Sequence, residues 1–187
     1  SNLFAEKMSY AFGIPKENVL CTGEPRNDYL FRPMDANMLS EKLGITIQDN
    51  FKYIIWMPTY RQSKFHDDND GAIYEFGFPI LTSENIVELH EFCKERKIVL
   101  VLKWHGSQKL PDMNTDSFSN FLFLTTEKLT ELSIPLYRLV ARCDALITDY
   151  SSIYINYLVL NRPICFAYDD MEKYINDRGF MFDNVKE

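Results

Sequence analysis

The sequence predicts an α/β fold: a Rossmann-like parallel sheet with helices on both faces, in a single domain over residues 1–187. Short apolar runs without polar alternation recur along the chain, and such runs are typical of strands buried on both faces. Segments with helical patterning separate these runs, and this alternation favours parallel strands joined by helices. A chain of 187 residues, of which 46% are apolar, is long enough to form its own core.

Each predicted strand is a short apolar run that ends at a polar or turn-forming residue. The run over residues 98–103 (IVLVLK) is the clearest, and the run over 53–57 (YIIWM) is stopped by Pro58. In chain order, we predict strands over residues 19–22, 53–57, 98–103, 120–124, 145–148 and 163–167.

The predicted helices lie between these strands and carry recognisable end signals. Asp35 can cap the start of one helix through its carboxylate, and Gly44 can end the same helix. Pro135 suits the first turn of another helix. In chain order, we predict helices over residues 3–12, 35–44, 83–96, 135–143, 152–160 and 169–176, with a long loop over residues 62–83.

Charge and composition exclude several classes of function. The net charge of −7 argues against general nucleic-acid binding but leaves room for a local basic site. No apolar run approaches the roughly 18 residues of a membrane span, and the first residues lack the features of a signal peptide. Because the chain does not begin with Met, we expect it to be a piece of a longer protein. The expected location is cytoplasmic, or peripheral at the inner face of the membrane for the full-length protein.

The sequence gives no sign of a metal or a cofactor. No two cysteines have C-x-x-C spacing, no three potential ligands have metal-site spacing, and the glycine-rich nucleotide fingerprints are absent. We therefore expect neither, with Asp149 and Asp169 as the carboxylates to consider should a metal bind. The cysteines are predicted to be four buried, reduced thiols: Cys21, Cys93, Cys143 and Cys165.

Basic residues follow several of the predicted strands. In a parallel sheet, ligands bind beyond the carboxyl ends of the strands, and all these ends meet at one edge. Arg26, Arg61, Lys103 and His105 each lie at or just after such an end. In a protein of net charge −7, their convergence would create a local anion site.

The segment 148–152 (TDYSS) adds a second anion-binding feature. A predicted strand ends at Thr148, Asp149 follows, and Ser151 and Ser152 open a helix. The unpaired N–H groups and the positive dipole end of a helix N-terminus attract anions. The alternative is a plain serine cap that contributes about 1 kcal/mol to stability. The neighbouring cations favour the anion site over the plain cap.

These segments belong to a longer series of motifs. In chain order, the motifs are residues 23–30 (GEPRNDYL), 57–61 (MPTYR), 103–105 (KWH) and 148–152 (TDYSS), followed by 162–164 (RPI), 168–169 (YD), Tyr174 and 178–180 (RGF). The series resembles the CDP-glycerol glycerophosphotransferase family of wall teichoic acid synthesis, over nearly the whole chain. The resemblance implies one half of a GT-B fold, namely the C-terminal, nucleotide-donor half, with the acceptor half absent.

The resemblance also implies roles for individual residues. His105 is the expected catalytic residue, which holds the donor pyrophosphate together with the two serines, while the likely base belongs to the missing half. Gly106 and Asn156 depart from the family pattern, which usually has Pro and Asp there, so CDP-glycerol, CDP-ribitol and other activated donors stay open. The expected substrate-binding residues are Arg26, Arg61, Lys103, Asp149, Ser151 and Ser152.

The implied reaction is transfer of a polyol phosphate in cell-wall or surface polymer synthesis. An acceptor hydroxyl attacks the β-phosphorus of a CDP-polyol and CMP leaves. The implied partners are CDP-glycerol or a related CDP-polyol, a polymer or lipid-linked acceptor, and the missing acceptor domain, so the isolated chain is expected to be inactive. Two alternatives stay open: a nucleotide-sugar glycosyltransferase or epimerase of the same fold, and a non-catalytic nucleotide-binding module.

Overall fold

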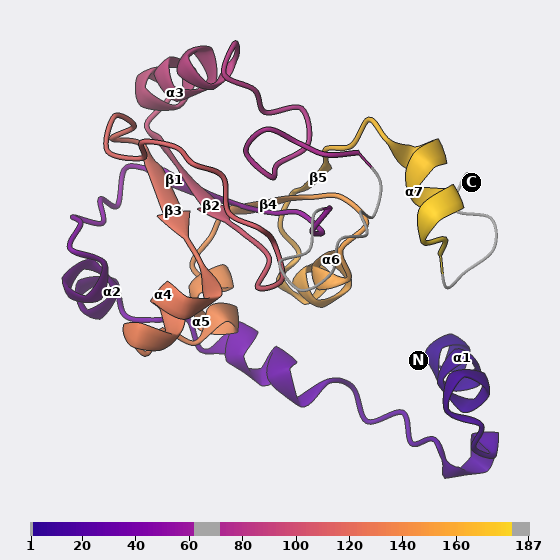
Figure 1. Ribbon diagram of the computed structural model, residues 1–187. Coiled ribbons are helices and arrows are strands. Elements are labelled where there is room, and N and C mark those ends of the chain that lie inside the picture. Colours follow the sequence, from indigo (N-terminus) through magenta and orange to yellow (C-terminus); the bar gives the residue numbers. More distant parts are fainter. Residues whose placement is uncertain (1, 62–71, 181–187) are drawn as a thin grey trace.

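A computed structural model describes residues 2–61 and 72–180 of the chain. Within them, a five-stranded parallel sheet has the strand order β3-β2-β1-β4-β5 (Figure 1). The predicted α/β fold with a parallel sheet is therefore confirmed. The strands are β1 (Lys52–Met57), β2 (Ile98–Lys103), β3 (Phe121–Leu124), β4 (Ala145–Thr148) and β5 (Ile164–Phe166).

The strand order creates a switch point between β1 and β4. β1 is the central strand, and Trp56 pairs with Leu102 of β2 on one side and with Ile147 of β4 on the other. The chain builds the sheet outward through β2 and β3 and then resumes on the other side of β1. In open parallel sheets, ligands bind in the crevice beyond such a point. The segments that follow β1 and β4 are therefore the first place to look for a site.

Helices cover both faces of the sheet (Figure 1). On one face, α3 (Ile86–Glu95) packs Ile86 and Cys93 into a core that includes Phe78 and Trp104. The core of the opposite face contains side chains from α2 (Ala36–Leu43), α4 (Thr126–Glu131), α5 (Leu136–Val140) and α6 (Ile153–Tyr157). The remaining helices are α1 (Asn2–Phe12), η1 (Lys16–Asn18), η2 (Pro25–Phe31), η3 (Leu158–Leu160) and α7 (Met171–Asp177).

The predicted ends of α2 are confirmed. Asp35 Oδ1 accepts hydrogen bonds of 3.0 Å from the backbone N–H groups of Asn37 and Met38. Gly44 follows the helix with φ 66, a conformation that glycine adopts without a steric penalty. Signals within a few residues of each other thus determine where this helix begins and ends.

The predicted strand over residues 19–22 is wrong. The segment is extended and exposed, with Leu20 at 78% exposure, and it belongs to no sheet within the described residues. An extended segment becomes a strand only when a neighbour satisfies its N–H and C=O groups. Here the chain leaves α1, which lies beside the α7 end of the molecule, and crosses to the α5 side without meeting the sheet (Figure 1).

The prediction of four buried thiols holds for only two of them. All four cysteines are free, but only Cys93 and Cys143 are buried. Cys21 is exposed because its segment lies away from the sheet, and Cys165 is exposed on β5, an edge strand. Burial therefore follows the position of each segment in the fold rather than its apolar character.

α4 was not predicted, yet Thr125 caps it by accepting a 3.1 Å hydrogen bond from the backbone N–H of Lys128. Of the predicted loop over residues 62–83, residues 62–71 lie outside the described part of the chain, and the rest is irregular. Among the described helices, none has both the length and the apolar character that crossing a membrane requires.

Candidate functional site

A cavity of about 580 Å³ lies beyond the carboxyl ends of β4 and β5. Its walls come from α1, the η2 segment, the start of α6 and the segments that flank α7. The volume is typical of small-molecule and cofactor sites. Of the predicted site residues, three belong to the walls, beside Glu24 and the rings of Tyr150 and Tyr168: Arg26, Asp149 and Ser152.

Arg26 lies on η2 and is oriented by its neighbours. Its Nε donates to Glu24 Oε2 at 2.5 Å, and its guanidinium lies 5.5 Å from the centroid of the Tyr137 ring. The hydrogen bond between them lowers the pKa of Glu24 and raises the pKa of Arg26, so both side chains are charged at neutral pH. Because both are about half exposed, the pair contributes little to stability. Its effect is to hold a guanidinium at the cavity wall.

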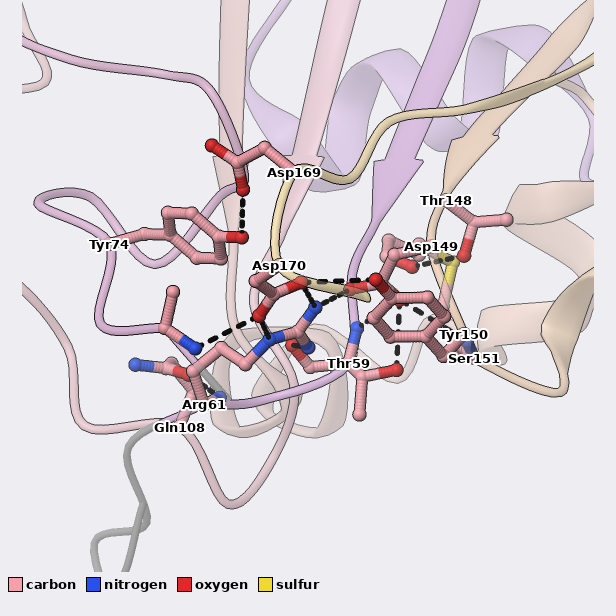
Figure 2. A network of polar contacts seen from close by, with 12 residues as sticks. Thr59, Arg61, Tyr74, Gln108, Thr148, Asp149, Tyr150, Ser151, Asp169 and Asp170 are labelled. Atoms are coloured by element: carbon pink, nitrogen blue, oxygen red, sulfur yellow. Dashed lines mark hydrogen bonds and ion pairs between the residues drawn. The ribbon is translucent and has the colours of Figure 1, made fainter. Parts of the chain in front are cut away.

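Arg61 is the centre of a buried polar network (Figure 2). Its Nε and Nη2 donate to the two carboxylate oxygens of Asp170 at 2.8 and 3.3 Å, and Nη2 also lies 2.9 Å from Asp149 Oδ2. Its Nη1 donates to the carbonyl of Thr59 at 3.0 Å. One guanidinium therefore joins the segments that follow β1, β4 and β5.

The other contacts of Asp149 extend this network to the start of α6 (Figure 2). Asp149 Oδ1 accepts hydrogen bonds from the backbone N–H and the hydroxyl of Thr59, both at 2.8 Å, and from the backbone N–H of Ser151 at 3.2 Å. The hydroxyl of Tyr150 donates to Asp170 at 3.1 Å. The position of the seryl segment is thus tied to the buried Arg61.

The charges in this network shift one another's pKa values. Burial alone would lower the pKa of Arg61, but Asp170 and Asp149 raise it above its usual value. Burial raises the pKa of Asp149 against the opposing effect of Arg61, whereas the hydrogen bonds from Arg61 hold the pKa of Asp170 below its usual value. Because two carboxylates share one guanidinium, Arg61 holds the segments behind the cavity together and offers no open cation to a ligand.

Lys103 ends β2 and is also buried, at 4% exposure. Its ammonium donates to the carbonyl of Trp104 and, at 3.0 Å, to Thr126 Oγ1. Burial lowers the pKa of Lys103 to about 8, with Glu127 acting in the opposite direction. The lowered pKa means that burying the charged ammonium destabilises the folded chain.

We expect Lys103→Met to be more stable than the wild type at pH 7, by up to about 3 kcal/mol. The pKa of Lys103 is about 8 in the folded chain against an ordinary 10.5, so between these values the unfolded chain binds the extra proton. The stability of the wild type should therefore rise with pH, and the advantage of the variant should shrink from pH 8 upward. Urea unfolding of both proteins between pH 7 and 10 measures the difference. An advantage that does not change with pH would contradict a buried ammonium.

His105 follows β2 and is accessible to solvent. Its Nδ1 accepts a 3.1 Å hydrogen bond from the backbone N–H of Ser107, so the neutral ring carries its proton on Nε2. The ring centroid lies 4.9 Å from that of Tyr60, and the guanidinium of Arg178 lies 5.4 Å from the same tyrosine ring. Desolvation of the ring and the charges of Lys103 and Arg178 lower the pKa of His105. At neutral pH it is a neutral hydrogen-bond donor through Nε2.

The two serines differ in their surroundings. Ser152 stands at the N-cap of α6, yet its side chain makes no capping hydrogen bond, and it is exposed at the cavity wall. Ser151 is half-buried and held through its backbone by Asp149. The plain capping role that the sequence left open is therefore not what the side chain of Ser152 does.

No metal centre is evident in the part of the chain that the structure describes. Within residues 2–61 and 72–180, no three His, Cys, Asp or Glu side chains gather in a way that could hold a metal ion. The two carboxylates considered from the sequence have other partners: Asp169 accepts a hydrogen bond from the hydroxyl of Tyr74, and Asp149 binds Arg61 and Thr59 (Figure 2).

The structure brings together some predicted site residues and separates others. Arg61 and Asp149 form an ion pair, and the charge of Lys103 acts on His105. The cavity that Arg26 helps to form has walls that, within the described residues, do not include Lys103, His105 or Arg61.

Sequence reasoning also missed two residues that organise the site. Asp170 binds Arg61 across 109 positions, and the only local signal is its place at the start of a predicted helix. Glu24 lies in a motif quoted above, but nothing in the sequence marks it as a wall of the cavity.

A family model now identifies the chain. The model described as CDP-Glycerol:Poly(glycerophosphate) glycerophosphotransferase matches residues 1–187. The chain belongs to this family. It is a domain of the teichoic acid polyol-phosphate polymerases and transferases, and the resemblance drawn from the motifs is confirmed.

Curated relatives come from the same area of cell-wall synthesis. The chain is 31% identical over 172 residues to the teichoic acid ribitol-phosphate polymerase TarL of Staphylococcus aureus, covering 91% of this chain and 28% of that protein. It is 30% identical over 182 residues to the teichoic acid glycerol-phosphate transferase of the same species, covering 95% and 42%. A teichoic acid ribitol-phosphate primase of Bacillus spizizenii is 27% identical over 174 residues, with 92% and 40% covered.

Solved structures of the wall teichoic acid polymerase TagF share the fold. One has a TM-score of 0.67 at 25% identity and covers 98% of this chain and 42% of that chain. A variant of TagF soaked with CDPG has a TM-score of 0.65 at 23% identity and covers 98% and 39%. The chain thus spans less than half the length of the relatives that it matches.

Proposed function

We propose that this domain binds a CDP-activated polyol and presents its pyrophosphate for transfer of the polyol phosphate to a hydroxyl acceptor. The observation that carries the proposal is the cavity of about 580 Å³ at the carboxyl edge of the sheet, with Arg26 and Ser152 in its walls. A guanidinium and a free hydroxyl suit phosphate oxygens, and the rings of Tyr150 and Tyr168 suit the face of a base. TagF, a relative by fold, has been soaked with CDPG.

The reaction needs no covalent intermediate with the protein. The oxygen of the acceptor hydroxyl forms a bond to the β-phosphorus, the bond from this phosphorus to the bridging oxygen breaks, and CMP leaves with the electron pair. The hydroxyl proton passes to a base. Catalysis then depends on position and on neutralising the charge that develops on the phosphate oxygens.

We assign His105 to the phosphate oxygens rather than to the base. Its Nδ1 is occupied by the backbone N–H of Ser107, so its Nε2–H can donate but cannot accept a proton. Its lowered pKa keeps the ring neutral, which preserves this donor at neutral pH. The base, in this proposal, comes from the acceptor half that the family resemblance implies, and the reaction takes place in the cytoplasm.

The proposal predicts selective but weak binding of cytidine nucleotides by residues 1–187, because one wall of the cleft is expected to come from the acceptor half. Calorimetric titration with CDP-glycerol, CMP, UMP and AMP measures the selectivity. We expect CDP-glycerol to bind tightest and CMP to bind more tightly than UMP or AMP. Equal affinity for the three monophosphates would reject a cytidine donor and favour a general nucleotide-binding module.

A further inference from the structure

Glu24 offers the cavity a carboxylate oxygen that is held in place and has no partner among the residues that the structure describes. Its Oε2 accepts from Arg26 Nε at 2.5 Å and from Asn156 Nδ2 at 2.7 Å. Within residues 2–61 and 72–180, no hydrogen bond or ion pair reaches its Oε1. A carboxylate has about four acceptor positions, so about half of its capacity is left for a ligand.

Asn156 fixes this carboxylate from behind the cavity wall. Its side chain is buried at 2% exposure, and its Nδ2 also donates to Asn27 Oδ1 at 2.8 Å. Its Oδ1 accepts a 3.1 Å hydrogen bond from the hydroxyl of Tyr137. The amide uses both donors and its acceptor within the protein, so it acts as a positioning residue for Glu24 and Arg26.

The other acidic residue of the cavity wall is not available in the same way. Asp149 uses Oδ1 for Thr59 and Ser151 and directs Oδ2 to Arg61. Glu24 is ionised, because its hydrogen bond to Arg26 lowers its pKa. An ionised carboxylate only accepts hydrogen bonds, so the ligand group that contacts it must be a donor such as a hydroxyl.

We propose that Glu24 accepts hydrogen bonds from hydroxyl groups of the donor, and that it is thereby a residue that determines specificity for a diol beside the pyrophosphate. This inference rests on the proposed function, since it concerns the same ligand. A guanidinium for the phosphate and a carboxylate for the hydroxyls lie side by side at Arg26 and Glu24. The diol can belong to the ribose or to the transferred polyol, and the two sources are separated by experiment.

The test combines one protein change with the removal of ligand hydroxyls. Glu24→Gln keeps the shape of the side chain and removes its charge, and Glu41→Gln on the exposed side of α2 serves as the matched control. The affinities of wild type and both variants are measured for CDP-glycerol, for the CDP ester of 1-propanol, for CDP and for 2′,3′-dideoxy-CDP.

We expect Glu24→Gln to weaken CDP-glycerol binding about 10-fold, as for loss of a hydrogen bond to a charged group, while Glu41→Gln has no effect. Removing the hydroxyls that Glu24 binds should abolish the difference between variant and wild type. If wild type and Glu24→Gln bind the propyl ester and CDP with equal affinity, the contact belongs to the polyol. If Glu24→Gln binds CDP more weakly than the wild type does, but binds the dideoxy nucleotide equally well, the contact belongs to the ribose. A loss of the same size for every ligand would overturn the inference and leave Glu24 a structural residue.

The outcomes for the two proposals are distinguishable. If the wild type binds none of these ligands, the proposed function fails and the inference fails with it. If the wild type binds them and Glu24→Gln binds every ligand as tightly, only the inference fails. If Glu24→Gln does not fold, Glu24→Asp replaces it in the test, because it keeps the charge but withdraws it from the cavity. We expect this variant to lose affinity only for ligands that carry the hydroxyls bound by Glu24.

The contact between Glu24 and Asn156 can be tested separately by thermal unfolding. Asn156→Asp brings a second carboxylate to the 2.7 Å contact and should lower the melting temperature by several degrees. Adding Glu24→Gln to this variant restores a donor opposite the new carboxylate and should recover most of the loss. Failure of the second change to recover stability would overturn the arrangement on which the inference depends.

Discussion

Arg61→Met should lower the free energy of unfolding by about 3–5 kcal/mol, the largest stability effect that we expect from a single substitution in this domain. The change keeps the apolar stem but removes the guanidinium that pairs with both Asp149 and Asp170. These carboxylates are buried at 1% and 7% exposure, so they would lose this positive charge while staying largely shielded from water. Urea unfolding at pH 7 measures the loss, which should also lower the melting temperature by on the order of 10 °C.

Acidification distinguishes this mechanism from simple loss of packing. In the wild type, the pKa of Asp170 lies below its usual value, so its contribution to stability is lost as the pH falls below the ordinary range of a carboxyl group. In Arg61→Met the two carboxylates no longer have the guanidinium beside them, so they take up protons more readily. Protonation removes the free-energy cost of burying their charges. The difference between the two proteins should therefore shrink at low pH. Arg96→Met, on the exposed end of α3, should change stability by less than about 0.5 kcal/mol and serves as the control. A gap that stays constant down to low pH would contradict the buried network.

His105→Ala should weaken donor binding with little change in stability. A hydrogen bond from His105 Nε2 to a pyrophosphate oxygen contributes roughly 1.5–3 kcal/mol, or about 10- to 150-fold in donor affinity and, in the full-length enzyme, in kcat/KM. The ring is accessible to solvent and contacts mainly Tyr60 and Ser107, so the melting temperature should move by only a few degrees.

His90 provides the matched control for this experiment. It lies on α3 at 7% exposure, accepts a 3.3 Å hydrogen bond from the backbone N–H of Asn120, and packs edge-on against Phe118 and Phe121. His90→Ala should lower the melting temperature and leave donor affinity unchanged. The reverse pattern, in which His105→Ala melts much lower but binds donor normally, would remove His105 from the site.

Most of the fold could be predicted because the sequence signals for its strands and helix ends come from residues that are close together in the chain. The apolar runs of β1, β2, β4 and β5 are three to six residues long, and they and the caps of α2 are encoded by residues that are neighbours in the sequence. The segment 19–22 shows the limit of such signals. It has the composition of a strand, but whether it pairs depends on a neighbour that the local sequence does not specify.

The candidate site also has features that local sequence predicts and features that depend on the tertiary structure. The sequence by itself determined that an α/β domain of this family places basic and hydroxyl residues after its strands, because strand ends and motifs are properties of neighbouring residues. Only the tertiary structure decided that Arg61 is neutralised by Asp170, 109 positions away, whereas Arg26 and Glu24 face a cavity. The physical reason is that desolvation and ion pairing depend on which strands become neighbours in the sheet, and strand order joins residues that are far apart in the chain.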